Sequence, residues 1–169
     1  NKSGYFIIFI DDGEYRKECG GRRRYYVYKY VLIFWRIDMA IKIIGTGSYL
    51  PENVADNHFL STIVDTNDEW ISQRTGIKER RLSSGSKEGT TYMATQAAKN
   101  AMEDAGVTAE EIDLIIVATV SADTYVPNTS CQVQGEIGAI RATCFDLNAA
   151  CSGFLFGLNT ADAYLETGM

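Results

Sequence analysis

The 169-residue sequence has few of the residues that build metal sites and few positive charges. It contains one histidine, His58, and four cysteines, Cys19, Cys131, Cys144 and Cys151, which lack the short paired spacings of a zinc site. The formal net charge of −6 disfavours a nucleic-acid partner, because phosphate binding requires a basic surface. Cysteine is also too sparse for a secreted disulfide scaffold. We therefore expect no metal, no nucleic-acid partner and a reducing compartment such as the cytoplasm.

Long hydrophobic runs are missing too. The apolar runs 5–10 (YFIIFI) and 31–35 (VLIFW) are too short to span a bilayer, and the first lacks a signal-peptide cleavage pattern. The sequence therefore predicts no membrane span. At 46% hydrophobic and 22% charged, the chain has the composition of an ordinary globular domain that can bury a core.

Residues 1–38 differ in composition from the rest of the chain. They carry eight Lys and Arg against five Asp and Glu, and ten of the nineteen aromatic residues, whereas residues 39–169 carry eight basic residues against seventeen acidic ones. We expect residues 1–38 to be an atypical, non-native N-terminal extension, with Met39 as the natural start. The alternative is a basic, aromatic arm that touches a membrane or a nucleic acid.

Strand and helix patterns alternate from Met39 onward. Strands are predicted at 41–47, 113–119 and 142–147. Helices are predicted from 67 to a stop at Gly76, at 90–105 before Gly106, at 130–137 and at 153–166. A capping box at 108–111 leads into the strand at 113–119. This alternation predicts an α/β layered fold with a mostly parallel or mixed sheet and helices packed on it.

Cys151 lies where a nucleophile would be useful. A thiolate is strongly nucleophilic, and a position at a helix N-terminus favours it. Cys151 falls between the strand predicted at 142–147 and the helix predicted from 153, and the small residues around it permit a tight turn like a nucleophile elbow. On spacing alone, a small buried residue at a strand-to-helix junction is equally consistent with the pattern. Cys131, on a helix face, and Cys144, within a strand, are interpreted as structural.

Four segments resemble one enzyme family, the β-ketoacyl-acyl-carrier-protein synthases III of the thiolase superfamily. They are residues 43–51 (IIGTGSYLP), 65–77 (DTNDEWISQRTGI), 117–119 (VAT) and 149–154 (AACSGF). The resemblance runs from Met39 to Met169 and implies the N-terminal half of a thiolase-like fold. It also implies a condensing enzyme in which Cys151 takes an acyl group from acyl-CoA and passes it to malonyl-acyl-carrier-protein, initiating type II fatty acid synthesis. Such an enzyme would be a homodimer in the cytoplasm, or in the plastid of a plant, and would use acyl-CoA as substrate without a cofactor.

The resemblance also assigns binding roles. Trp70 and Arg74 match family residues that line the CoA nucleotide site, where an indole stacks on adenine and a guanidinium pairs with phosphate, and Thr66 adds a polar contact. Without the resemblance, Trp70 reads as a core anchor and Arg74 as a solvated charge. Val126, before Pro127, matches a residue that reaches across the dimer and shapes the partner's acyl pocket. A phenylalanine is familiar there in acetyl-preferring relatives, so we expect a different acyl primer.

The family's catalytic histidine and asparagine come from its second half, and the sequence stops at Met169 before either. His58 cannot substitute, because it lies near the first loop as a surface or helix-start residue. We therefore expect this fragment to be inactive in condensation on its own. Two alternatives stay open. One is another acyl-CoA-using condensing enzyme of the superfamily, such as a hydroxymethylglutaryl-CoA synthase or a polyketide starter synthase. The other is a non-catalytic, truncated CoA-binding or dimerisation module.

Overall fold

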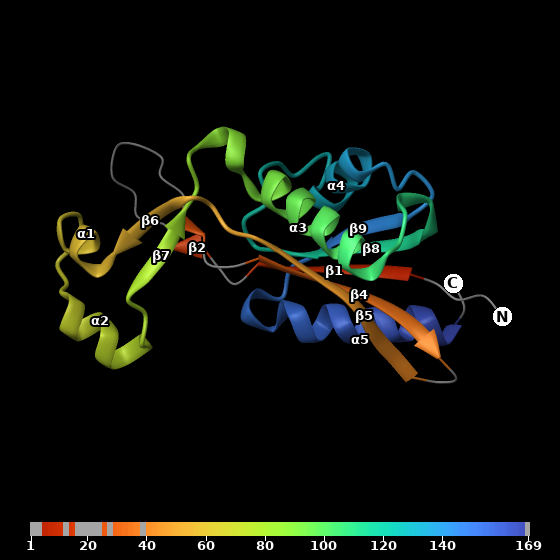
Figure 1. The fold of residues 1–169 in the computed structure, drawn as a ribbon, viewed down its shortest axis with the longest axis horizontal. Coiled ribbons are helices and arrows are strands. Elements are labelled where there is room, and N and C mark those ends of the chain that lie inside the picture. Colours follow the sequence, from red (N-terminus) through yellow and green to blue (C-terminus); the bar gives the residue numbers. More distant parts are fainter. Residues whose placement is uncertain (1–4, 12–13, 16–24, 27–28, 38–39, 168–169) are drawn as a thin grey trace.

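The computed structural model describes residues 5–11, 14–15, 25–26, 29–37 and 40–167, with side chains from residue 42 onward except residue 86. Met39, the predicted start, and Cys19 lie outside the described residues. The body of the molecule has three layers: helices α3 and α4 cover one face of a sheet and α5 covers the other (Figure 1). This arrangement confirms the predicted α/β layered fold.

The main sheet has five strands in the order β5-β4-β1-β8-β9. These are β1 (Tyr5–Asp11), β4 (Lys29–Ile37), β5 (Ala40–Tyr49), β8 (Ile112–Ala118) and β9 (Thr143–Leu147). The β1–β8 and β8–β9 pairs are parallel, while β4 runs antiparallel to both of its neighbours, so the sheet is mixed.

Residues 1–38 contribute two of these strands, β1 and β4. Because β1 pairs with β8 and β4 pairs with β5, the sheet runs across the predicted boundary between residues 38 and 39. The apolar runs at 5–10 and 31–35 thus supply sheet strands in this structure. That the segment is non-native stays a prediction.

The helices of the body follow the sequence pattern closely. They are α3 (Thr90–Ala105), α4 (Thr129–Ile137) and α5 (Gly153–Thr167). Gly106 ends α3 in the left-handed conformation with φ of 65°, which glycine adopts without steric cost. The predicted capping box is present in the short 3₁₀ helix η2 (Ala109–Glu111), where Glu111 accepts from the backbone N–H of Thr108 at 2.8 Å. Helix and strand boundaries in this region are therefore confirmed.

The core lies on both faces of β8. On one face, an alanine stripe of α3 packs with Ile112 and Ile115; on the other, Leu114 and Ile116 pack against α5. Small residues let α3 approach β5 closely: a Cβ added at Gly47 would lie 2.3 Å from the backbone nitrogen of Ala101. Glycine is therefore required at Gly47 for this packing.

A second sheet forms an arm at one end of the body (Figure 1). Its four strands have the order β2-β3-β7-β6, and they are β2 (Glu14–Tyr15), β3 (Tyr25–Tyr26), β6 (Asn53–Asp56) and β7 (Glu79–Leu82). Two short helices, α1 (Asn57–Ser61) and α2 (Asp68–Thr75), connect β6 to β7. The term "arm" below means β6, α1, α2 and β7. No helix in the described part of the chain has the length and apolarity needed to cross a membrane.

The arm joins the body near the 3₁₀ helix η1 (Ser86–Glu88). The Tyr49 hydroxyl donates to Glu88 Oε1 at 2.6 Å, and the Ser84 backbone N–H donates to Glu88 Oε2 at 2.6 Å. The hydrogen bond to Glu88 and burial both raise the pKa of Tyr49. For Glu88, burial favours the neutral form, but the bonds from Tyr49 and Ser84 outweigh it and lower the pKa. This carboxylate therefore links β5 to the segment that follows the arm.

Candidate active site

Cys151 is exposed in a tight turn between β9 and α5. The turn is the 3₁₀ helix η3 (Ala150–Ser152), and α5 continues directly from it at Gly153. The Thr119 backbone N–H donates to the Leu147 carbonyl at 3.1 Å, which holds the end of β9 beside the end of β8. Cys151 is therefore at the strand-to-helix junction predicted from the sequence, and its exposure separates it from an inert buried cysteine.

Two backbone features shape this turn. Ala150 has φ of 46°, in the left-handed region that a residue with a Cβ seldom occupies, so the turn contains local strain. Gly153 is buried, and a Cβ added there would lie 3.0 Å from the Ala118 Cβ, tighter than an ordinary contact. The start of α5 thus rests against the end of β8, and the small residues around Cys151 are needed for that approach.

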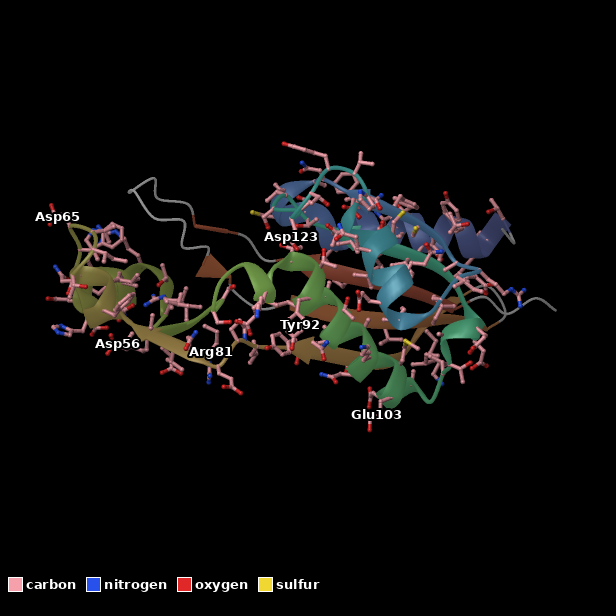
Figure 2. All side chains as sticks on the ribbon, turned by 90° about the horizontal axis from the view of Figure 1, so that it is seen from above. Asp56, Asp65, Arg81, Tyr92, Glu103 and Asp123 are labelled. Atoms are coloured by element: carbon pink, nitrogen blue, oxygen red, sulfur yellow. The ribbon has the colours of Figure 1, made fainter. Side chains whose placement is uncertain are left out.

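Helices α3 and α4 differ from this turn at their first residues. Asp123 accepts from the backbone N–H groups of Thr90 at 3.0 Å and Thr91 at 2.7 Å, at the start of α3 (Figure 2). Asp146 does the same for the first two residues of α4, at 2.9 and 2.8 Å. The N-cap residue of η3, Ala149, has no polar side chain with which to cap the turn. The positive end of a helix dipole stabilises an anion, and at α3 and α4 a carboxylate lies at that end.

Trp70 and Arg74 lie one helical turn apart on α2, and the structure brings them together. The guanidinium carbon of Arg74 is 4.4 Å from the centroid of the Trp70 ring, a cation–π distance. Trp70 is 52% exposed, so the interpretation of Trp70 as a core anchor is wrong. The indole and the guanidinium form a flat, positively charged surface that suits a base and a phosphate.

The sequence predicted how α2 begins and ends. Asn67 caps the helix by accepting from the Trp70 backbone N–H at 2.8 Å, and Gly76 ends it with φ of 71°. Thr66, the third residue predicted to contact CoA, lies just before the cap. Its Oγ1 is buried and has no hydrogen-bond partner among the described residues, so a contact of this oxygen with a ligand would require the segment before α2 to move.

The arm and the Cys151 turn are separate in the structure. Figure 1 shows α2 in the arm and the N-terminal end of α5 at the same end of the body as the arm. Trp70 and Arg74 thus lie together, apart from Cys151. A substrate that uses both places must be long, with its recognised end away from its reacting end.

Val126 is 88% exposed in the loop between β8 and α4, beside Tyr125, which is 97% exposed. The ends of this loop are fixed: Gln132 Nε2 donates to Thr124 Oγ1 and to the Pro127 carbonyl, each at 2.9 Å. The two exposed side chains therefore project from a loop that is tied at its base. That Val126 contacts a second subunit stays a prediction.

Cys131 and Cys144, both interpreted from the sequence as structural, are in contact in the structure. Their Sγ atoms are 3.0 Å apart, joining α4 to β9. Burial, and then the hydrogen bond with Cys131, raises the pKa of the Cys144 thiol to about 12. Little thiolate therefore exists at Cys144 near neutral pH, which makes it a poor nucleophile.

Sequence reasoning missed several polar residues that hold the site elements in place. Asp123 and Asp146 cap helices from a distance along the chain, so no local motif marks them. Asn57 is 2% exposed and bonds residues at both ends of α2, although asparagine is usually a surface residue. His58 is exposed in α1, as predicted.

Comparison with known proteins adds a family context to this geometry. The family model described as 3-oxoacyl-[acyl-carrier-protein] synthase III matches residues 145–169, which include Cys151. A β-ketoacyl-[acyl-carrier-protein] synthase III of Clostridium botulinum is 59% identical over 126 residues, covering 75% of this chain and 38% of the relative. The chain therefore spans well under half the length of this relative.

Two solved structures are similar over the same share of the chain. The 3-oxoacyl-[acyl-carrier-protein] synthase III of Aquifex aeolicus VF5 has a TM-score of 0.71 at 53% identity, over 75% of this chain and 41% of that one. The priming β-ketosynthase of the R1128 polyketide biosynthetic pathway has a TM-score of 0.71 at 38% identity, over 75% of this chain and 38% of that one. Both similarities confirm the thiolase-like fold.

Proposed function

Because the chain belongs to the β-ketoacyl-acyl-carrier-protein synthase III family, of whose members it spans about two fifths, we propose that it supplies the acyl-accepting part of such an enzyme. The exposed Cys151 in the strained turn at the start of α5 is the observation that carries the proposal. The reaction is the condensation of a short acyl-CoA with malonyl-acyl-carrier-protein, which initiates type II fatty acid synthesis.

The first half of this reaction needs little beyond the turn itself. The Cys151 thiolate attacks the carbonyl carbon of acyl-CoA, the bond from that carbon to the CoA sulfur breaks, and CoA leaves as a thiolate that takes a proton. Negative charge develops on the carbonyl oxygen during the attack. Backbone N–H groups at the start of η3 are suited to stabilise it, because the first N–H groups of a helix have no partner within that helix, whereas those of Ser152 and Gly153 already donate to the Ala149 and Ala150 carbonyls.

CoA recognition is proposed for the arm. Trp70 stacks on the adenine, Arg74 pairs with a phosphate, and Thr66, just before α2, adds a polar contact. The separation of α2 from Cys151 suits CoA, whose nucleotide and thioester are at opposite ends of a long molecule. No resident metal or cofactor is assigned, since acyl-CoA brings its own leaving group.

The second half of the reaction requires groups from outside this chain. Malonyl-acyl-carrier-protein loses carbon dioxide, and the resulting carbanion attacks the carbonyl carbon of the acyl group on Cys151. The bond from that carbon to the Cys151 sulfur then breaks, and Cys151 leaves as a thiolate. We propose that a histidine and an asparagine of the family's second half stabilise the charge in these steps, and that the complete enzyme is a cytoplasmic homodimer with Val126 at the acyl pocket of the partner. The isolated chain is then competent in acylation only.

A direct test is to incubate the chain with acetyl-CoA and measure the mass gain of one acetyl group, then locate it by peptide mapping. We expect the label on Cys151, with loss of at least about a thousandfold in rate in the Cys151→Ala variant. Cys144→Ala is the matched control and should keep the rate. Labelling of another cysteine, or none, would contradict the proposal. Condensation with malonyl-acyl-carrier-protein by this chain alone would contradict the need for a second half.

The similarity to a priming β-ketosynthase favours a second candidate, a starter synthase that loads a different primer. Val126 in place of a larger aromatic side chain is consistent with it. Acylation by a series of acyl-CoA chain lengths separates the two, because a preference for longer or branched primers over acetyl favours the starter synthase. A chain that binds CoA without acylating Cys151 would instead be the non-catalytic module.

A further inference from the structure

Asn57, the first residue of α1, is the most deeply placed polar side chain of the arm. It is 2% exposed, and the other buried side chains of the arm are the apolar Ala55 and Ile71. A buried amide costs free energy unless its donors and acceptor are paired. The bonds that Asn57 makes therefore decide how the arm is assembled.

The Asn57 amide connects three separate segments. Its Nδ2 donates to Asp68 Oδ1 at 2.7 Å and to the Ile77 carbonyl at 2.8 Å, with Ser72 Oγ at a longer 3.4 Å. Its Oδ1 accepts from Arg80 Nη2 at 2.8 Å. Both donors and the acceptor of one side chain are thus used, and their partners lie within α2 and after it.

These contacts fix both ends of α2. Asp68 is the first residue of the helix, and Ile77 follows the glycine that ends it. Arg80, on β7, also donates to the Ala55 carbonyl at 3.2 Å, so the amide is backed by the paired strands β6 and β7. Burial lowers the pKa of Arg80. An arginine side chain nevertheless stays protonated in proteins, so its charge assists the bond to Asn57.

Apolar packing cannot hold α2 by itself. Its eight residues include one buried side chain, Ile71, and a helix of this length is unstable in water without outside contacts. The Lys78–Asp68 ion pair at 3.4 Å is exposed on both sides, and pairs of this kind contribute little. The Asn57 amide supplies a buried polar link between α2 and the rest of the arm.

We propose that Asn57 is a positioning residue for CoA recognition: by joining Asp68, Ile77 and Arg80 it sets α2 so that Trp70 and Arg74 face the nucleotide together. This inference rests on the proposed function, because it takes the Trp70–Arg74 pair as the CoA nucleotide site. Asn57 itself is buried and does not touch the ligand. Its effect is on the half-saturating concentration of acyl-CoA and leaves the chemistry at Cys151 unchanged.

The test compares Asn57→Asp and Asn57→Ala with the unchanged chain. Aspartate has nearly the same shape as asparagine, but it loses both N–H donors and faces the Asp68 carboxylate. Each variant is assayed for Cys151 acylation with acetyl-CoA and with the acetyl thioester of N-acetylcysteamine, which has no nucleotide. We expect the half-saturating acetyl-CoA concentration to rise about tenfold or more, with the maximal rate and the small-thioester rate within about twofold.

Two further variants keep the test decisive. Asn100→Asp is the matched control, because Asn100 also donates its amide to a backbone carbonyl, that of Ser48 at 2.8 Å, but on α3. It should leave both substrates unaffected. Combining Asn57→Asp with Asp68→Asn exchanges donor and acceptor across the 2.7 Å bond and should restore part of the acetyl-CoA affinity. If Asn57→Asp alone does not fold, the double variant can be assayed in its place.

CoA binding, followed by tryptophan fluorescence, separates failure of this inference from failure of the proposed function. If neither thioester acylates Cys151 but CoA binding still weakens in the Asn57 variants, the proposed chemistry is wrong and the positioning role stands. Equal losses of acylation rate with both thioesters would mean that Asn57 is only structural. The positioning role would also be overturned by an unchanged half-saturating acetyl-CoA concentration in the Asn57 variants, or by a lack of CoA binding to the unchanged chain.

Discussion

The body and the arm are held together by different forces. In the body, β8 and the alanine stripe of α3 pack mainly through apolar side chains, and the backbone approaches too closely at Gly47 for a side chain to fit there. In the arm, the buried apolar set is small, and the hydrogen bonds of Asn57 carry the assembly. Apolar packing is cooperative and rigid, whereas a few polar links can be altered one at a time.

This difference matches what each region is proposed to do. A nucleophile needs a fixed position, and Cys151 follows β9 and precedes α5, both packed on the core. A ligand-binding surface must be accessible to solvent, and Trp70 is exposed on a short helix. We therefore expect substitutions in the body to change global stability, and substitutions in the arm to change recognition and local opening.

The largest effect is expected from Gly47→Ala in the body. The new Cβ would lie 2.3 Å from the Ala101 nitrogen and from the Ala97 carbonyl oxygen, and these backbone atoms cannot rotate away. We expect the free energy of unfolding to fall by at least about 3 kcal/mol, measured by urea denaturation.

Gly135→Ala is the matched control for that substitution. It lies in α4, and a Cβ there would meet nothing within 4 Å. Alanine is favoured over glycine within a helix, so this variant should keep its stability or gain about 0.5–1 kcal/mol. If both glycine variants behaved alike, α3 would not approach β5 as closely as described.

The body was also the region that the sequence predicted best. The strand Ile112–Ala118 and the helix Thr90–Ala105 have strong periodicity and clear stop signals, so local pattern and final structure agree. The tight turn at Cys151 was predicted because small residues lie there between a strand and a helix. The strands β1 and β4 received no such prediction, because their place in the sheet depends on pairing with distant strands.

In the arm, local signals were found and long-range ones were missed. Asn67 and Gly76 mark the ends of α2 through capping chemistry that the sequence displays. Asn57 gave no signal, because its partners Asp68 and Arg80 are 11 and 23 residues away and come together only in the folded chain. The pairing of distant polar groups follows from the fold and has no period of its own.

A smaller effect is expected from removing matched helix caps, one in each region. Asn67 caps α2 in the arm, and Asn128 caps α4 in the body by accepting from the Cys131 N–H at 2.9 Å. Alanine at either position should cost about 1 kcal/mol. For Asn128→Ala the cost should appear in global unfolding by urea.

For Asn67→Ala the same cost should appear locally. Hydrogen exchange of the α2 amides should become about fivefold faster while the urea midpoint changes little, because local opening of the arm does not require unfolding of the body. An equal fall in global stability for both variants would show that arm and body unfold as one unit, and the contrast between the regions would not hold.

The smallest effect is expected from acid, and it tests the polar links of the arm. The bond from Asn57, and then that from Ser72, lowers the pKa of Asp68. A carboxyl group whose pKa is lower in the folded chain stabilises the fold above its unfolded pKa of about 3.9, and this stabilisation is lost as the pH falls through the lower folded value.

The arm should therefore loosen only below about pH 4, which can be followed by NMR titration of the Asp68 carboxyl carbon. Asn57→Ala should raise the pKa of Asp68 toward its ordinary value, whereas Tyr49→Phe should raise the pKa of Glu88 and leave Asp68 unchanged. A response of Asp68 to Tyr49→Phe would mean that the two carboxylates are coupled, so that the arm is not held independently of its junction with the body.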